Sequence, residues 1–258
     1  MKLKREKFVL LFLFQVLFLL IVLGTVEILV RNEVINSLFL AAPSSVILDI
    51  FNLFKDGFIW PHFYVTFSEF IVGYSISAVL GIAIGICLLM IPWIEKFFQP
   101  FISALMAIPK VTIVPLLGLW LGIGLTHKIT IVFLFCFFTI LVNTITGIKQ
   151  TKEKHLKVSK VYEASVWQII WKVILPSAAP TIIAGLRISA ASGLVGALFA
   201  EMLASKAGLG NVLVKATTLF DTSQAFAIVV LVTIMSVLII AVINLLETHV
   251  FLRWKKKN

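Results

Sequence analysis

Six long apolar runs occupy most of this 258-residue chain. A helix needs about 20 mainly apolar residues to cross about 30 Å of hydrocarbon. The strands of a membrane β-barrel are shorter and alternate between apolar and polar residues, so these continuous runs favour helices. The sequence therefore predicts an all-α integral membrane protein with six transmembrane helices. The expected spans are residues 8–30, 66–90, 97–121, 128–148, 178–203 and 223–246.

Little of the sequence remains for a separate soluble domain. Hydrophobic residues make up 60% of the chain and charged residues 13%, whereas soluble domains usually have about 45–50% and about 25%. The first run has no small-residue cleavage site, which favours an anchor helix over a removable signal peptide. We expect one transmembrane domain over residues 1–258, with an anchor helix at about 8–30 and a core at about 62–250.

The positive charges indicate how the chain is oriented. With six spans, both termini and the segment 149–175 lie on one side, which holds 15 lysines and arginines, and the other side holds five. Positive residues accumulate on the cytoplasmic side, so both termini are predicted to be cytoplasmic. The formal net charge of +10 is therefore mainly an orientation signal. It is not a basic patch on a soluble fold, and nucleic acid is not an expected partner.

Small residues recur along one face of two runs. In lipid, this spacing lets helix backbones approach closely, and it predicts tight packing. Contact with a transported solute is the alternative, chiefly for the two serines of the second group. The groups are Gly73, Ser77, Gly81 and Gly85, and then Gly185, Ser189, Ser192 and Gly196.

The third run contains two prolines and a lysine. Pro109 and Pro115 each lack a backbone donor and are predicted to disrupt the helix. Lys110 lies between them. An ionisable residue at membrane depth indicates a functional site, so all three residues are candidates for a translocation pathway. The alternatives are that Lys110 extends to the membrane surface, or that this segment lies partly outside the bilayer.

The fifth run carries two charges on one face. Arg187 and Glu201 are 14 residues apart, which is about 21 Å along a helix and too far for an ion pair. Either residue could face an aqueous pathway. A structural role is the favoured alternative for both, with Glu201 capping structure at the outer surface.

The cytoplasmic segment 149–175 contains a predicted helix. From Leu156 onward, apolar residues recur at helical spacing among basic ones, up to Val173. Such a helix could lie on the anionic inner leaflet of the membrane lipid. It could equally be presented to a cytosolic partner.

Several stretches together resemble one family of membrane proteins. They are residues 107–124 (AIPKVTIVPLLGLWLGIG), 137–148, 185–188 (GLRI), 200–202 (AEM) and 208–210 (GLG), and the Leu175-Pro176 pair that ends the cytoplasmic segment. In this order and spacing, the chain resembles the permease subunit of binding-protein-dependent ABC importers, of the nitrate/sulfonate/taurine type. The resemblance implies the transmembrane fold of a type I ABC importer.

The family has a cytoplasmic signature: EAA, three residues, Gly, nine residues, and then IxLP. Counting back from Pro176 places the family Gly at Glu163 and the family Glu at Lys157, so the visible Glu163-Ala164-Ser165 is not the family's EAA. The resemblance implies a coupling helix from about Ser159 to Val173 that docks on an ATPase. The positions assigned to coupling are Lys157, Ser159, Glu163, Ala164, Ser165, Trp167, Gln168, Val173, Leu175 and Pro176.

The resemblance also implies the partners. Cytosolic ABC ATPase subunits would hold ATP and Mg²⁺, since this chain has no GxxxxGK[ST] phosphate loop. A second permease copy or a paralogue would complete the pathway. An extracytoplasmic solute-binding protein would dock on residues 31–65 and 205–222. The expected location is the inner or plasma membrane of a prokaryotic cell, and no cofactor or metal is expected on this chain.

Two other classes of function fit this sequence less well. A polytopic membrane enzyme would need a catalytic set, but the four histidines show no HExxH spacing and the two cysteines have no nearby histidine. An ATP-independent carrier or an exporter could have six spans, but the cytoplasmic signature disfavours it. The branch includes importers of nitrate, taurine and alkanesulfonates, and others of pyrimidine precursors of thiamine or of riboflavin. General similarity favours the pyrimidine-precursor group.

Overall fold

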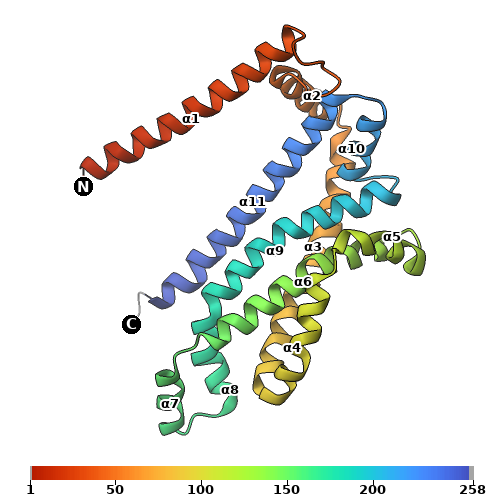
Figure 1. Cartoon of the computed structure of the whole chain (residues 1–258). Helices are drawn as coiled ribbons and strands as arrows, with labels where there is room; N and C mark the ends of the chain where they lie inside the picture. Colours follow the sequence, from red (N-terminus) through yellow and green to blue (C-terminus); the bar gives the residue numbers. More distant parts are fainter. Residues whose placement is uncertain (1, 256–258) are drawn as a thin grey trace. The chain divides into compact units, whose positions relative to one another are not determined.

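The computed structural model describes residues 2–255, and across them it contains helices and connecting turns but no strand. Lys256 and Lys257, which contribute to the orientation signal, lie outside the described residues. The helices (Figure 1) are α1 (Lys2–Arg31), α2 (Pro43–Lys55), α3 (Ile59–Met90), α4 (Pro92–Ala107), α5 (Lys110–Leu121), α6 (Leu125–Lys149), α7 (Glu153–Val161), α8 (Val166–Ile169), the π-helical turn η1 (Ile170–Ile174), α9 (Leu175–Ala204), α10 (Leu209–Thr218) and α11 (Thr222–Lys255).

Five helical stretches of the described chain are long and apolar enough to cross a membrane. The pair α4 and α5 passes the same test together, with a bend of 91° between its halves, and would make a sixth span. The predicted all-α membrane fold is confirmed. The five are Leu10–Arg31, Ile59–Met90, Leu125–Lys149, Val166–Leu203 and Thr222–Leu245.

The chain divides into two compact units, Met1–Trp60 with Val212–Leu231, and Pro61–Asn211 with Val232–Asn258. In the first unit, α2 is fastened to the end of α1. Glu27 accepts hydrogen bonds from the backbone N–H of Ser44 over 3.0 Å and from its hydroxyl over 2.7 Å. Glu27 also forms an ion pair with Arg31, one helical turn further along α1. From Leu10 onward, most apolar side chains of α1 are exposed, as expected for a helix that faces lipid.

In the second unit, α6 packs between α3 and α9. Val132, Cys136 and Ile140 of α6 are completely buried. The small residues of α3 lie against α6: a Cβ added at Gly73 would approach Val132 Cβ to 2.7 Å, and one at Gly85 would approach Thr144 Cγ2 to 2.7 Å. Side chains larger than hydrogen would push these helices apart.

The small residues of α9 meet α6 in the same way. A Cβ at Gly185 would come within 2.5 Å of Asn143 Cβ, and one at Gly196 within 2.9 Å of Phe135 Cγ. Gly81 and Ser77 complete the α3 contact, with the Ser77 hydroxyl 3.1 Å from the Phe133 carbonyl. These glycines fix the spacing of the three helices.

The bend between α4 and α5 is at Pro109, as predicted. Ile108 and Pro109 are extended, with ψ angles of 127° and 104°, because the residue before a proline is kept out of the helical region. The predicted disruption at Pro115 is wrong, since α5 continues through it. Pro115 removes one helical hydrogen bond, and the buried residues Val114 and Leu117 on either side hold α5 in place.

Candidate functional site

The cytoplasmic segment forms two short helices, with a turn where one helix was predicted. The expected helix from Ser159 to Val173 is interrupted between α7 and α8. Glu163 has a φ of +50°, a left-handed conformation that ends helices and favours glycine. Glu163 is the position that the family signature assigns to glycine. The backbone N–H of Ala164 closes the turn by donating to the Ser159 carbonyl over 3.0 Å.

Helix α8 begins with a capping box. The backbone N–H of Ser165 donates to Gln168 Oε1 over 2.9 Å, and the Gln168 N–H donates to Ser165 Oγ over 3.3 Å. The pair satisfies two backbone donors that a helix start leaves free. Sequence reasoning assigned Ser165 and Gln168 to coupling, and the structure gives them this local role.

No loop separates α8 from α9. The π-helical turn η1 joins them, with the Leu175 N–H donating to the Ile170 carbonyl, and Pro176 lies in the first turn of α9. Residues Val166–Leu203 therefore form one continuous helical stretch. The family-like Leu175-Pro176 pair lies at the change from η1 to α9, and Val173 is half-buried in η1.

The apolar residues of this segment divide between two surfaces. Ile170 is buried, and with Ile169 and Ile174 it lines a cavity of about 200 Å³ shared with residues of α3 and α6. Tyr162 and Trp167 are solvent-exposed, with 81% and 70% of their surface accessible. Val161 and Trp171 are also exposed, and Val166, which lines the same cavity, is exposed as well. Lys157 is solvent-exposed and forms an ion pair with Glu153 of its own helix at 3.5 Å.

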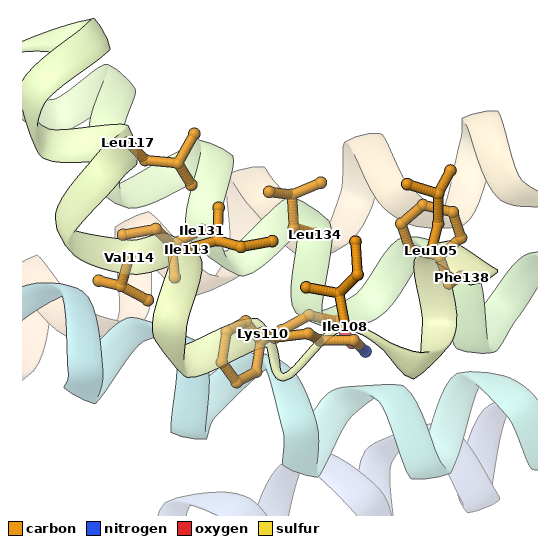
Figure 2. Close-up of a pocket in the computed structure, with 10 residues that line it drawn as sticks. Leu105, Ile108, Lys110, Ile113, Val114, Leu117, Ile131, Leu134 and Phe138 are labelled. Carbon is orange, nitrogen blue, oxygen red and sulfur yellow. The ribbon is translucent and has the colours of Figure 1, made fainter.

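Lys110 lies at the bend of the third span (Figure 2). Its Nζ donates to the Phe135 carbonyl over 3.0 Å and lies 5.7 Å from the centre of the Phe135 ring. The residue lines a cavity of about 90 Å³ between α4, α5 and α6. The other lining residues are apolar: Leu105, Ile108, Ile113, Val114, Leu117, Ile131, Leu134, Phe135 and Phe138.

The other pathway candidates have partners within the fold. Arg187 Nη2 forms an ion pair with Glu247 Oε2 of α11 at 3.0 Å. The hydroxyls of Ser189 and Ser192 donate to carbonyls of their own helix, those of Leu186 and Ile188. The structure thus places these three side chains in helix-to-helix or intrahelical contacts.

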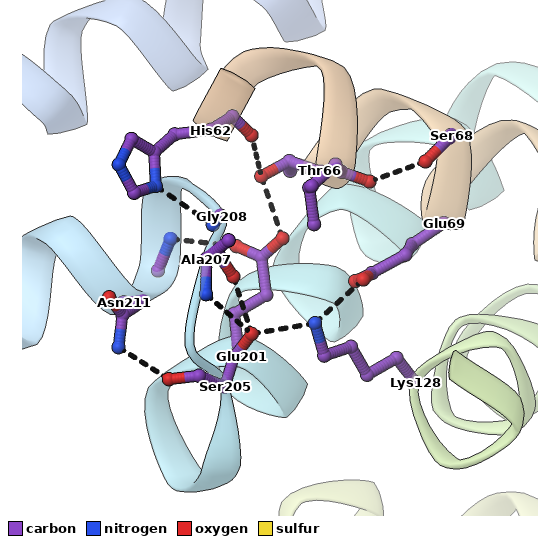
Figure 3. A network of polar contacts seen from close by, with 12 residues as sticks. His62, Thr66, Ser68, Glu69, Lys128, Glu201, Ser205, Ala207, Gly208 and Asn211 are labelled. Atoms are coloured by element: carbon purple, nitrogen blue, oxygen red, sulfur yellow. Dashed lines mark hydrogen bonds and ion pairs between the residues drawn. The ribbon is translucent and has the colours of Figure 1, made fainter. Parts of the chain in front are cut away.

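Glu201 is completely buried and holds the start of α10 (Figure 3). It accepts hydrogen bonds from the Thr66 hydroxyl and from the Gly210 N–H, each over 2.7 Å. The Leu209 N–H donates to Thr66 Oγ over 2.9 Å, and the Gly208 N–H donates to His62 Nδ1 over 3.0 Å. Three backbone donors at the positive end of α10 therefore find acceptors on α3 and α9.

An ion pair next to Glu201 was missed by sequence reasoning. Lys128 Nζ lies 2.7 Å from Glu69 Oε1, and both residues are buried. Lys128 also donates to Ser205 Oγ over 2.6 Å. Glu69 stood inside an apolar run, which is a signal for a polar role at membrane depth, but its partner is 59 positions away and no sequence pattern connects them. Among the described residues, no group of three or more His, Cys, Asp or Glu could hold a metal ion.

Residues 77–256 match the family described as the binding-protein-dependent transport system inner membrane component. That match covers most of the fold described above, including the bent span, α7–α9 and α11. The chain belongs to this family. It is the permease of an ABC importer and a multi-pass membrane protein, as the resemblance implied.

Curated relatives match along most of their length. The riboflavin transport system permease protein RibX of Chloroflexus aurantiacus is 29% identical, over 84% of this chain and 80% of that protein. The formylaminopyrimidine transport permease protein ThiX of Halalkalibacterium halodurans is 28% identical, over 85% and 87%. The taurine transport system permease protein TauC of Escherichia coli is 28% identical, over 80% and 77%.

The fold also matches a solved transporter. A chain of the MetNI methionine ABC transporter, in an inward-facing conformation, aligns with a TM-score of 0.56 and 18% identity. The alignment covers 73% of this chain and 92% of that chain. The two share the type I importer fold that the sequence predicted.

Proposed function

We propose that this permease passes a small solute from an extracytoplasmic binding protein into the cell, driven by a cytosolic ABC ATPase that docks on α7 and α8. A second permease chain, either a copy or a paralogue, would complete the pathway. ATP and Mg²⁺ would bind the ATPase, because this chain lacks a phosphate-loop motif. Both termini would then be cytoplasmic, on the side with the larger number of positive residues.

The solute would belong to one of the classes for which the relatives are named. These are taurine and related sulfonates on one side, and riboflavin or formylaminopyrimidine on the other. Identity is similar for all of them, at 28–29%, so sequence similarity does not separate the classes.

The exposed aromatic surface of Tyr162 and Trp167 is the observation that carries the docking proposal. Large apolar side chains on a water-facing segment indicate a protein interface, and aromatic residues contribute most to binding energy at such sites. In the same segment, Ile170 is buried and Ser165 forms a capping box, and both restrict the conformation of α8. A preorganised surface of this kind loses little conformational entropy on binding.

The experiment is co-purification of the permease with its genome-encoded ABC ATPase after co-expression in membranes. Replacing both Tyr162 and Trp167 with alanine should reduce the recovered ATPase at least about tenfold, since each truncated anchor costs on the order of 2 kcal/mol. Phe18→Ala is the matched control, because Phe18 is an equally exposed aromatic residue on α1. Full ATPase recovery with the double variant would contradict the docking proposal. A loss with Phe18→Ala as well would indicate general misassembly.

A further inference from the structure

One cation inside the fold lacks a carboxylate partner. Among the lysine and arginine side chains that the structure describes, three are buried or half-buried: Lys110, Lys128 and Arg187. Lys128 pairs with Glu69 at 2.7 Å, and Arg187 pairs with Glu247 at 3.0 Å. Lys110 instead donates to the backbone carbonyl of Phe135. A carbonyl offers a hydrogen bond but no countercharge, so the positive charge of Lys110 is not neutralised.

The helix that begins at Lys110 adds to this positive charge. α5 is 12 residues long, and no side chain caps its first backbone N–H groups. The N-terminus of such a helix carries the positive end of its dipole. Where a membrane helix is broken in this way, the positive end of the second half is suited to bind an anionic group. The ammonium group and the helix end therefore favour the same kind of ligand.

The cavity beside Lys110 suits an apolar body attached to that anionic group. Leu105, Ile108 and Phe138 line it from α4, from the bend and from α6 (Figure 2). Its volume of about 90 Å³ is smaller than the ~150 Å³ cavity that accommodates a benzene ring. A short alkyl segment fits this space, and a fused ring system does not.

From these three observations we infer that Lys110 is the binding residue for the anionic group of the transported solute, a small aliphatic sulfonate or carboxylate whose alkyl part enters the adjacent cavity. On binding, Lys110 Nζ would exchange the Phe135 carbonyl for the anion. This inference rests on the proposed function as an importer permease. It goes beyond that function because it separates the charged solute classes from the uncharged ones and assigns the choice to one side chain.

The test measures binding to the full-length permease in phosphatidylcholine nanodiscs by saturation-transfer NMR titration. Butanesulfonate is the anionic probe, and butyl methyl sulfone is its uncharged counterpart. Wild type and Lys110→Arg should bind butanesulfonate, and Lys110→Gln should bind it at least about tenfold more weakly, which is the usual effect of losing a hydrogen bond to a charged group. Lys152→Gln removes the same charge at an exposed position between α6 and α7 and should bind as wild type does.

The sulfone should bind wild type at least about tenfold more weakly than the sulfonate. This comparison needs no variant, so it decides the inference even if Lys110→Gln fails to assemble. No measurable sulfonate binding to wild type, equal binding of the two probes, or equal sulfonate binding by wild type and Lys110→Gln would overturn the inference.

Two further arms separate the possible sources of the effect. Sulfonate affinity should be unchanged in nanodiscs that also contain phosphatidylglycerol, whereas loss of binding there would show that Lys110 pairs with a lipid phosphate and would overturn the inference. Association with the ATPase is measured in parallel. If the wild-type permease binds the sulfonate but no ATPase, only the docking proposal is contradicted. If it binds the ATPase but no sulfonate, only the role of Lys110 is contradicted.

Discussion

The hydroxyl of Thr66 donates a hydrogen bond to Glu201 Oε1 over 2.7 Å, joining two helices at positions 135 residues apart in the sequence. The same oxygen of Thr66 accepts from the Leu209 N–H. Thr66 is completely buried, so removing its hydroxyl would take one hydrogen bond from Glu201 Oε1 and one from the Leu209 N–H.

Thr66→Val should therefore destabilise the fold by about 1–3 kcal/mol, the usual cost of leaving buried polar groups unpaired. The measurement is the thermal unfolding midpoint in detergent. Thr130→Val is the control, because the Thr130 hydroxyl bonds to the carbonyl of Thr126 in its own helix and joins no second helix among the described residues. Equal midpoints for the two variants would show that the Thr66 contact contributes little.

Lys128 and Glu69 form a buried ion pair, and we predict that removing one partner costs more than removing both. Lys128→Met leaves the Glu69 carboxylate buried without its countercharge, which should cost about 3–5 kcal/mol. Lys128→Met combined with Glu69→Leu should recover much of that loss. Denaturant unfolding of the single and double variants closes the cycle, and additive losses would argue against a coupled pair.

Glu163 stands in a left-handed turn with a φ of +50°, where glycine has no steric penalty. Glu163→Gly should raise the free energy of unfolding by about 0.5–1 kcal/mol. Glu163→Ala is the informative control, because alanine retains the strain and should give no gain. The measurement is the thermal unfolding midpoint of wild type and of the two variants. If alanine raised the midpoint as much as glycine, the glutamate side chain, and not the backbone conformation, would be the unfavourable feature.

Gly185 lies where α9 meets α6, and an added Cβ would come within 2.5 Å of Asn143 Cβ. Gly185→Ala should lower the unfolding midpoint, with a cost of about 1–3 kcal/mol from overpacking. Gly24→Ala makes the same change on α1, where nothing lies within 4 Å of the added atom, and should be neutral or slightly stabilising. Similar midpoints for the two variants would contradict the close approach of α6 and α9.

The sequence was sufficient to predict features that depend on local composition. The apolar runs gave the all-helical membrane fold, and Pro109 gave the position of the bend, because hydrocarbon length and proline geometry act within a few residues. Pro115 was misjudged for a related reason. A proline early in a helix costs one hydrogen bond, and the packing of Val114 and Leu117 on their neighbours offsets that cost.

The candidate sites depended more on tertiary contacts. That Arg187 pairs with Glu247 and Lys128 with Glu69 could not be read from spacing, since both pairs join separate helices. Of the three buried or half-buried cations among the described residues, Lys128 and Arg187 pair with carboxylates in these contacts. Lys110 contacts a backbone carbonyl instead. The turn at Glu163 was hidden because glutamate gives no signal for a left-handed conformation. Only the register of the family signature marked that position as one for glycine.

Because η1 joins α8 to α9 without a loop, Trp167 and Glu201 belong to one continuous helical stretch. The 34 positions between them correspond to about 50 Å at 1.5 Å per residue. If an ATPase docks as proposed, a displacement of Trp167 would therefore be transmitted along this stretch to the Glu201 cap of α10 at its other end. The π-helical turn η1 and Pro180 are the two points where this helical stretch can bend. The stiffness of these two points would determine how much of a displacement at Trp167 reaches Glu201.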